Sequence, residues 1–237
     1  IFSGARMDRK KYLIIISDLS SPASGLARLP MLGQRAVLHV AMEIFIRAAN
    51  GITVIAVLPK SMMEEWRQYC YRKNFIYPQI IVPSGITRFH SISNALAKIP
   101  DNALVAVHDG NRPLLSRTLV ESCFEKASRF PAVVPVIPPS GPLKLAAGKM
   151  ADDGSKYYEP VRGTLPDQSL FYCTQTPQVF HSELLKKAFA RAYDTSFTDA
   201  AAVVSTVNSV AFIDGERRNF AILTGDDLRM AAALADA

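Results

Sequence analysis

The sequence has little cysteine and none of the cysteine patterns that mark a zinc site or a disulfide framework. Three cysteines occur in 237 residues, and Cys70, Cys123 and Cys173 include no CxxC pair. An odd number of widely spaced cysteines argues against both kinds of site. We therefore expect free thiols in a reducing compartment, the cytoplasm, because disulfides are rare there.

Long apolar runs are absent too. No stretch approaches the roughly 20 apolar residues that a membrane helix needs. No signal-peptide pattern opens the sequence either, so we expect no membrane partner. We interpret residues 1–6, which precede Met7, as foreign to the native chain.

An acidic excess is also lacking, because 27 Lys and Arg face 21 Asp and Glu, for a net charge of +6. A basic excess favours anionic partners such as nucleotides and sugar phosphates. The basic residues form no long run, and the densest groups are residues 6–11 and 217–218. A nucleic-acid site needs a larger basic patch, so we expect no nucleic-acid partner.

Several common catalytic motifs are missing. No GxGxxG follows the first strand and no GxxxxGK[ST] occurs, which argues against a dinucleotide-dependent dehydrogenase and a P-loop kinase. No GxSxG elbow supports a serine hydrolase. The four histidines stand at no metal-ligand spacing: they are His39, His90, His108 and His181. Only His108 has an unusual place, beside an aspartate at a strand end.

The sequence does contain a regular alternation of apolar strands and amphipathic helices. The strands that we predict are 12–17, 52–58, 79–82, 103–108 and 132–137, and the helices are 36–49, 61–72, 87–98 and 116–129. This alternation is typical of a three-layer, Rossmann-like α/β fold, with a mostly parallel twisted sheet between helices. A length of 237 residues suits one domain.

The alternation breaks at Pro138. Residues 138–167 contain five prolines and a turn signal at 151–154, so we predict an inserted β-arm there. After the arm we predict strands at 169–174, 210–213 and 220–223, and helices from Ser182, around 199–206 and from Asp226.

The first candidate site follows the apolar strand that ends at His108. Asp109 stands at the carboxyl end of that strand, where open α/β sheets bind their ligands. A carboxylate there can hold Mg²⁺ or a substrate hydroxyl. Arg112 is placed to brace the loop or to contact a phosphate. A turn-capping Asp and a surface Arg would explain the same pattern.

Two further polar segments lie later in the chain. Residues 173–180 (CTQTPQVF) follow a predicted strand and include Thr176. Thr198 and Asp199 precede the predicted helix 200–206, and Thr198 is placed to cap it. Capping alone explains the pair, although a hydroxyl and a carboxylate at a helix start can also contact a polyol phosphate.

These segments, in this order and spacing, resemble the 2-C-methyl-D-erythritol 4-phosphate cytidylyltransferases, which carry VHDAARP-like, QTPQ and TDE or TDD motifs. Residues 84–92 resemble the family's GGxxRxxSV segment, and residues 219–228 resemble its C-terminal NIKVTxPEDL stretch. The resemblance runs from about Lys11 to Ala235. The combination of HDxxRP with QTPQ is specific. The ribitol 5-phosphate cytidylyltransferases share these motifs and remain an alternative.

The resemblance implies a nucleotide-diphospho-sugar transferase fold and transfer of CMP from CTP to the polyol phosphate, with Mg²⁺ as cofactor and pyrophosphate as product. It also implies a homodimer held by the 138–167 arm, with CTP and a polyol phosphate as ligands. The resemblance implies these roles: catalytic for Asp109, Arg112 and Arg28, nucleotide-binding for Gly85, Arg88, Ser91 and Gly25, polyol-phosphate-binding for Thr198, Asp199 and Thr176, and metal-binding for Asp109.

The sequence departs from the family where cations are expected. The family has a glycine-rich loop after its first strand, followed by PKQ, and these groups hold the triphosphate. Here residues 17–25 contain a single glycine, Gly25, and introduce Asp18. Ala27 takes the lysine position, with Arg28 as the nearest cation.

Other family positions differ as well. Ala221, or Ile222 if the register slips by one, stands for a C-terminal lysine. Ile86 stands for a nucleotide-contacting aspartate and Gln168 for an arginine of the arm. The cations available to replace the lost ones are Lys144, Arg28, Arg88, Arg162, Arg217 and Arg218. Two hypotheses therefore stand beside each other: a divergent enzyme, and a homologue that binds or regulates without catalysis.

Overall fold

The computed structural model describes residues 9–17, 26–163 and 167–235 of the chain. Its centre is an eight-stranded sheet. The strands are β1 (Lys10–Ile16), β4 (Thr53–Leu58), β5 (Gln79–Pro83), β6 (Ala103–Asp109), β7 (Ala132–Ile137), β10 (Cys173–Thr174), β11 (Gln178–His181) and β12 (Ala211–Asp214).

One half of the sheet is parallel. β1 lies between β4 and β6, and β5 pairs with the outer side of β4, all in parallel register. β11 is antiparallel to both β6 and β7, and β12 is parallel to β7. Continuously apolar strands such as β1 suit this arrangement, because helices cover both faces of the sheet.

Alternate residues of each strand face opposite helical layers. Ile15 packs in one core cluster with α1 (Val37–Ala48), α2 (Lys60–Arg72) and α4 (Arg117–Lys126). Ile14 packs in another cluster; its helices are α3 (Arg88–Leu96), α5 (Ser182–Phe189) and α6 (Ala200–Ser205). This two-residue period confirms the predicted three-layer α/β class.

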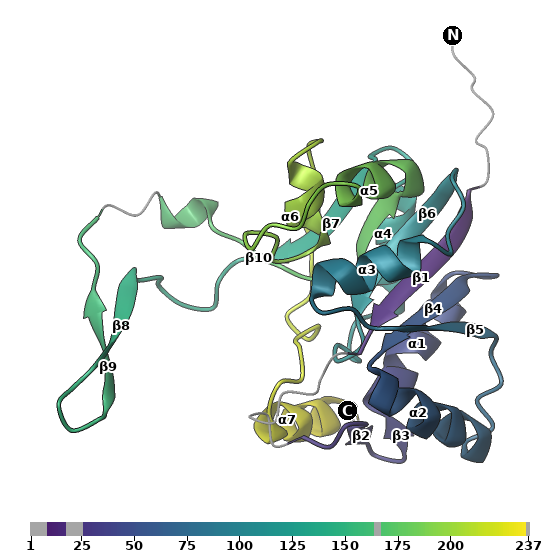
Figure 1. Cartoon of the computed structure of the whole chain (residues 1–237), viewed down its shortest axis with the longest axis horizontal. Coiled ribbons are helices and arrows are strands. Elements are labelled where there is room, and N and C mark those ends of the chain that lie inside the picture. Colours follow the sequence, from purple (N-terminus) through teal and green to yellow (C-terminus); the bar gives the residue numbers. More distant parts are fainter. Residues whose placement is uncertain (1–8, 18–25, 164–166, 236–237) are drawn as a thin grey trace, which may run out of the picture.

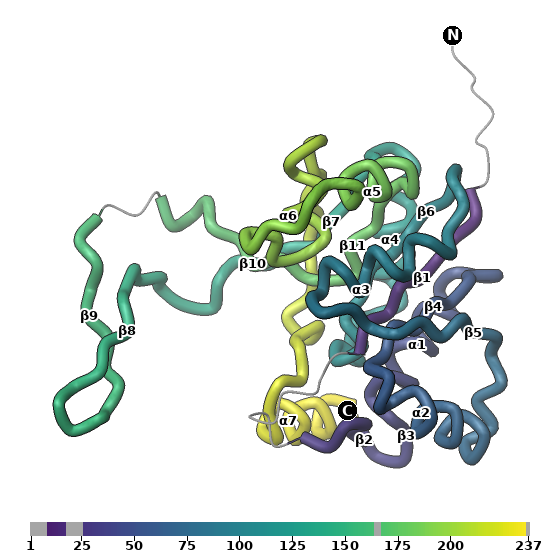
Figure 2. Tube along the Cα trace, viewed as in Figure 1, coloured from purple at the N-terminus to yellow at the C-terminus, as the bar shows by residue number. Residues whose placement is uncertain are grey.

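The helix near the end of the described chain packs against a segment that lies near its beginning. A short hairpin of β2 (Met31–Leu32) and β3 (Arg35–Ala36) turns at Gly33, whose φ is +59°. α7 (Gly225–Ala235) lies beside β2, although the two are far apart in sequence (Figure 2). Leu32, Ala231 and Ile222 belong to the same buried cluster.

The predicted β-arm is present as an antiparallel hairpin. β8 (Ala146–Met150) and β9 (Lys156–Pro160) pair with each other, and every residue of both strands is exposed. The hairpin stands away from the sheet (Figure 1). Within the described chain the hairpin therefore leaves apolar side chains uncovered, such as Met150 and Tyr158.

Two predictions for the second half of the chain are wrong. Residues 220–223 form no strand, because Ile222 N donates to Asn111 O (2.9 Å) and Asn111 Nδ2 donates to Ile222 O (3.2 Å), which bonds this segment to the loop after β6. Of the strand predicted at 169–174, only β10 forms, and β11 was not predicted.

Among the described residues, no helix is both long and apolar enough to cross a membrane.

Candidate functional site

The loop after β6 brings Asp109 to the carboxyl edge of the sheet. Asp109 is the last residue of β6 and lies opposite Ile16, the last residue of β1. Gly110 follows in close contact with the sheet, because an added Cβ would lie 2.8 Å from Leu38 Cδ1 and 3.1 Å from Ile16 O. This close approach holds the loop against the end of β1.

Two arginines share the Asp109 carboxylate. Arg88 Nη1 lies 2.6 Å from Oδ1, and Arg112 Nε donates to Oδ2 at 3.0 Å. Burial by itself would raise the pKa of Asp109, but the charges of Arg88 and Arg112 outweigh it and lower the pKa to about 2. Asp109 is therefore ionised at neutral pH, and its side chain is 20% exposed.

The segment between β10 and β11 supplies the next group. The Thr176–Pro177 peptide is cis, and Thr176 Oγ1 accepts from Asp109 N at 3.1 Å. The same hydroxyl lies 3.0 Å from His108 Nδ1. Thr176 thus ties this segment to the loop after β6.

Asp199, rather than Thr198, caps α6. Its Oδ1 accepts from Ala202 N at 2.7 Å, and its Oδ2 accepts from Gln178 Nε2 at 2.8 Å and Thr174 Oγ1 at 3.1 Å. The predicted cap at Thr198 is wrong, because the longer carboxylate reaches both the helix and the sheet. Thr198 is exposed instead.

These side chains line one cavity of about 260 Å³ at the end of the sheet; its walls are Arg88, Asp109, Arg112, Thr174, Gln175, Thr176, Gln178, Thr198 and Asp199. Four segments distant in sequence meet there. Ligands of open α/β sheets bind at this edge. The structure thus brings six of the predicted site residues together: Arg88, Asp109, Arg112, Thr176, Thr198 and Asp199.

A tight turn adjoins the cavity at the start of α3. Gly85 N donates to Ser91 Oγ at 3.0 Å, and Ser91 is fully buried. A Cβ at Gly85 would lie 2.4 Å from His90 Cβ, so the turn requires glycine. Both residues shape the turn that leads into Arg88, and their contact with a nucleotide stays a prediction.

Gln175 and Gln178 were not singled out from the sequence, although both lie in the QTPQ motif. Gln175 Nε2 donates to Glu216 O at 2.8 Å, and its Oε1 accepts from Glu216 N at 3.0 Å. Gln178 Oε1 accepts from Ala201 N at 2.9 Å while its Nε2 binds Asp199. The motif therefore fixes neighbouring segments through its amides, a role that two polar residues beside a proline do not reveal.

Comparison with known proteins agrees with this geometry. A model of the family described as IspD: 2-C-methyl-D-erythritol 4-phosphate cytidylyltransferase matches residues 27–236. The chain belongs to this family. It is 34% identical over 203 residues to the member from Phocaeicola vulgatus, and the aligned residues cover 85% of this chain and 87% of that relative. It is 32% identical over 233 residues to the member from Azobacteroides pseudotrichonymphae, covering 96% and 100%.

Solved structures show the same fold. The 4-diphosphocytidyl-2C-methyl-D-erythritol synthase from Anaerococcus prevotii matches with a TM-score of 0.76 at 23% identity, over 99% of this chain and 100% of that chain. The 2-C-methyl-D-erythritol 4-phosphate cytidylyltransferase from Thermus thermophilus matches with a TM-score of 0.68 at 28% identity, over 97% and 100%. The arrangement of sheet and helices is therefore that of the cytidylyltransferase family.

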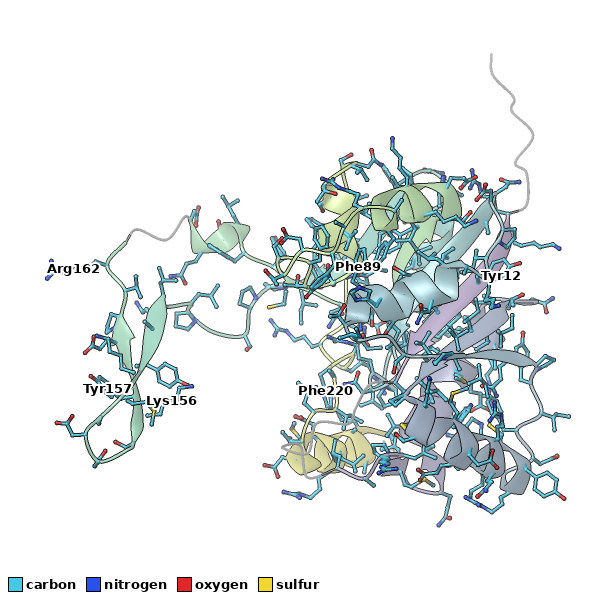
Figure 3. The ribbon with its side chains drawn as sticks, in the orientation of Figure 1. Tyr12, Phe89, Lys156, Tyr157, Arg162 and Phe220 are labelled. Carbon is cyan, nitrogen blue, oxygen red and sulfur yellow. The ribbon has the colours of Figure 1, made fainter. Side chains whose placement is uncertain are left out.

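The charged side chains that line the cavity of this chain are balanced, with two positive and two negative groups. Arg88 and Arg112 are opposed by Asp109 and Asp199. Arg28 is exposed and is not among the side chains that line the cavity. Gly25 and Asp18 lie outside the described residues. Arg162 sits on the arm, far from Phe89 at the start of α3 (Figure 3).

The residue at the family's arm arginine position has an internal role. Gln168 Oε1 accepts from Leu143 N and Gln168 Nε2 donates to Leu143 O, both at 3.2 Å. This pair of bonds closes the base of the arm.

Within residues 9–17, 26–163 and 167–235, no group of three or more His, Cys, Asp or Glu side chains is arranged to hold a metal ion.

Proposed function

We propose that this chain transfers CMP from CTP to 2-C-methyl-D-erythritol 4-phosphate and releases pyrophosphate, a step in the synthesis of isoprenoid precursors. The observation that carries the proposal is the Arg88–Asp109–Arg112 arrangement in a family member's cavity. An ionised carboxylate and two guanidiniums suit a substrate that bears both hydroxyls and phosphate.

In this reaction a phosphate oxygen of the polyol phosphate attacks the α-phosphorus of CTP. The bond from that phosphorus to the bridging oxygen breaks, and pyrophosphate leaves with the electron pair. Catalysis of this kind depends on in-line positioning and on charge stabilisation. Arg88 and Arg112 keep further N–H groups beyond those that bind Asp109, and these can bind phosphate oxygens. The Asp109 carboxylate accepts a hydrogen bond from a hydroxyl of the polyol.

The proposal includes Mg²⁺. Magnesium in proteins commonly has one or two carboxylate ligands, with phosphates and water completing its octahedron. Asp109 fits that pattern, because each of its oxygens accepts from one arginine and has a lone pair left. The metal would supply positive charge at the triphosphate, which the neutral cavity does not provide.

The proposal also includes a homodimer in the cytoplasm. The uncovered apolar side chains of the arm, such as Leu145 and Tyr158, favour a second copy of the chain as their cover. A two-fold dimer is the commonest oligomer. The three cysteines are free, which suits a reducing compartment. Size-exclusion chromatography with light scattering tests the dimer. A monomer mass at all micromolar concentrations would reject it.

Two alternatives are kept because the cavity is neutral and several family cations are replaced. One is a different polyol phosphate, such as ribitol 5-phosphate. The other is a homologue that binds or regulates without catalysis. Both remain compatible with the family's fold and with the arginine pair around Asp109.

The deciding experiment begins with calorimetric titration of CTP in the presence of Mg²⁺, with ATP as the control. Metal-dependent and cytosine-selective binding supports the enzyme. Pyrophosphate release is then compared between 2-C-methyl-D-erythritol 4-phosphate and ribitol 5-phosphate. Faster release with the second substrate would reassign the polyol. Absence of CTP binding would reject catalysis and leave the non-catalytic alternative.

A further inference from the structure

His108 is a buried histidine beside the site to which the proposed reaction gives no task. It is fully buried at the end of β6, and its ring lies 4.8 Å from the ring of Phe45. His108 Nε2 lies 3.2 Å from Arg112 O. A carbonyl oxygen can only accept, so Nε2 carries the proton of the neutral ring and Nδ1 is an acceptor.

The acceptor at Nδ1 sets the direction of the Thr176 hydroxyl. Thr176 Oγ1 lies 3.0 Å from Nδ1 and therefore donates its one proton to His108. The same oxygen accepts from Asp109 N at 3.1 Å. Full burial disfavours a charged ring, and with the one proton on Nε2 the Nδ1 atom is left as an acceptor.

This direction matters because a second acceptor competes for the same proton. Asp109 Oδ2 lies 3.4 Å from Thr176 Oγ1. With the proton on the His108 side, no hydrogen lies between these two oxygens. Within the part of the chain that the structure describes, Oδ2 then accepts from Arg112 Nε alone, and a lone pair of this oxygen stays open to the cavity.

We propose that His108 is a positioning residue that holds the Thr176 proton away from Asp109 and so keeps Oδ2 open to a hydroxyl of the polyol phosphate. The inference rests on the transfer reaction proposed above. His108 also braces the loop by donating to Arg112 O, which lies three residues beyond Asp109. Both effects act through other residues, since no atom of His108 is exposed.

The first test is His108→Leu, which keeps a similar volume and removes the acceptor. The Thr176 proton then turns to Oδ2 and competes with the substrate hydroxyl. We expect KM for the polyol phosphate to rise about tenfold, the effect of one lost hydrogen bond to a charged group. KM for CTP should change by less than about twofold, since the change concerns one substrate only.

The discriminating test is the double variant His108→Leu with Thr176→Val. Without the hydroxyl no proton competes for Oδ2, so KM for the polyol phosphate should return to within about threefold of Thr176→Val alone, a strong non-additivity. His108→Asn, which keeps an acceptor near the Nδ1 position, should raise KM less than His108→Leu does. A double variant worse than both single variants would overturn the proposal and leave His108 a purely structural residue.

A matched control is available in the same protein. His39 is also buried, and its Nδ1 lies 2.9 Å from the Tyr69 hydroxyl, but it is not among the residues lining the cavity. His39→Leu removes the same kind of bond and should leave both KM values unchanged. A rise in the polyol-phosphate KM in this control would show that general loosening, rather than proton direction, explains His108→Leu.

A spectroscopic measurement separates this inference from the proposed function. In ¹⁵N-histidine NMR spectra, His108 should show the tautomer protonated at Nε2, with a slowly exchanging Thr176 hydroxyl proton close to its ring. The Nδ1-protonated tautomer would overturn the inference even in an active enzyme. If the wild-type protein releases no pyrophosphate, the proposed function fails, and the spectrum still decides the hydrogen-bond arrangement. It also serves if His108→Leu does not fold.

Discussion

Asp109 is the residue at which the polar contacts of the cavity meet. Arg88 and Arg112 bind one carboxylate oxygen each, and its backbone N–H binds Thr176. The sequence placed Asp109 and Arg112 at a strand end and marked both as candidates. It did not show that Arg88, which precedes Asp109 by a helix and a strand, completes the same ion pair.

Asp109→Asn should lower kcat/KM for cytidylyl transfer by about a hundredfold or more, the effect of removing a single electrostatic group from a site. The amide is neutral and leaves both arginines without their shared charge. Steady-state pyrophosphate release measures the change in kcat/KM. The control is Glu121→Gln, since Glu121 pairs with Arg117 on the exposed surface of α4, and its kinetics should match the wild type.

His39 should make the protein less stable in mild acid. Burial lowers the pKa of His39, opposed by the charge of Glu43 and assisted by Arg35 and Lys73. The unfolded chain therefore binds a proton more readily, and the free energy of unfolding falls as pH drops below the ordinary histidine pKa of about 6.5, by at most about 1.4 kcal/mol per pH unit.

Urea denaturation at pH 7.5 and pH 5.5 measures this dependence in the wild type and in His39→Phe. His108 titrates in the same direction, so the variant isolates the part due to His39. The wild type should lose more stability than the variant over this interval. Equal losses in both proteins would contradict the assignment.

At the scale of elements, apolar runs and their spacing predicted the parallel half of the sheet well. β1, β4, β5, β6 and β7 form within a few residues of the predicted strands. The errors lie at 169–174 and 220–223. Residues 168–170 form a local turn instead, in which Phe171 N bonds to Gln168 O. Ile222 bonds to the distant Asn111, a partner that no local pattern encodes.

The arm is an element that should be separable from the body. Replacing residues 146–160 by a short glycine linker removes both exposed strands, which pair only with each other in the sheet arrangement of the described residues. We expect Tm to change by less than about 2 °C, because surface changes away from the core typically cost within about 0.5 kcal/mol. Because the proposed dimer is held by the arm, the variant should have a monomer mass in light scattering. A stable dimer would place the interface elsewhere.

At the scale of the whole molecule, Gln175 joins the sheet to the C-terminal segment. Its amide bonds both backbone groups of Glu216 and also Asn219 O (3.3 Å). Arg112 Nη1 donates to the same Asn219 oxygen at 2.8 Å. The site loop and the tail that leads to α7 are therefore held by one buried network.

Gln175→Leu should lower the free energy of unfolding by about 2–4 kcal/mol, because it leaves the part-buried N–H and C=O of Glu216 without this side-chain partner. Urea denaturation with an unchanged m-value measures this loss. The matched control is Gln68→Leu on α2, where the exposed amide binds Glu64, and its effect should stay within about 0.5 kcal/mol. Equal effects of the two substitutions would deny the network its stabilising role.

The sequence by itself determined the α/β class, the inserted arm, the family and the motif residues of the site. These features are local: strand and helix periods, turn residues and short motifs depend on neighbours in the chain. Only the tertiary structure decided that Arg88 pairs with Asp109, that Gln178 binds Asp199 and that His108 directs the Thr176 hydroxyl. Such contacts join segments tens of residues apart, and a hydrogen bond a few ångströms long depends on how the packed sheet and helices bring those segments together.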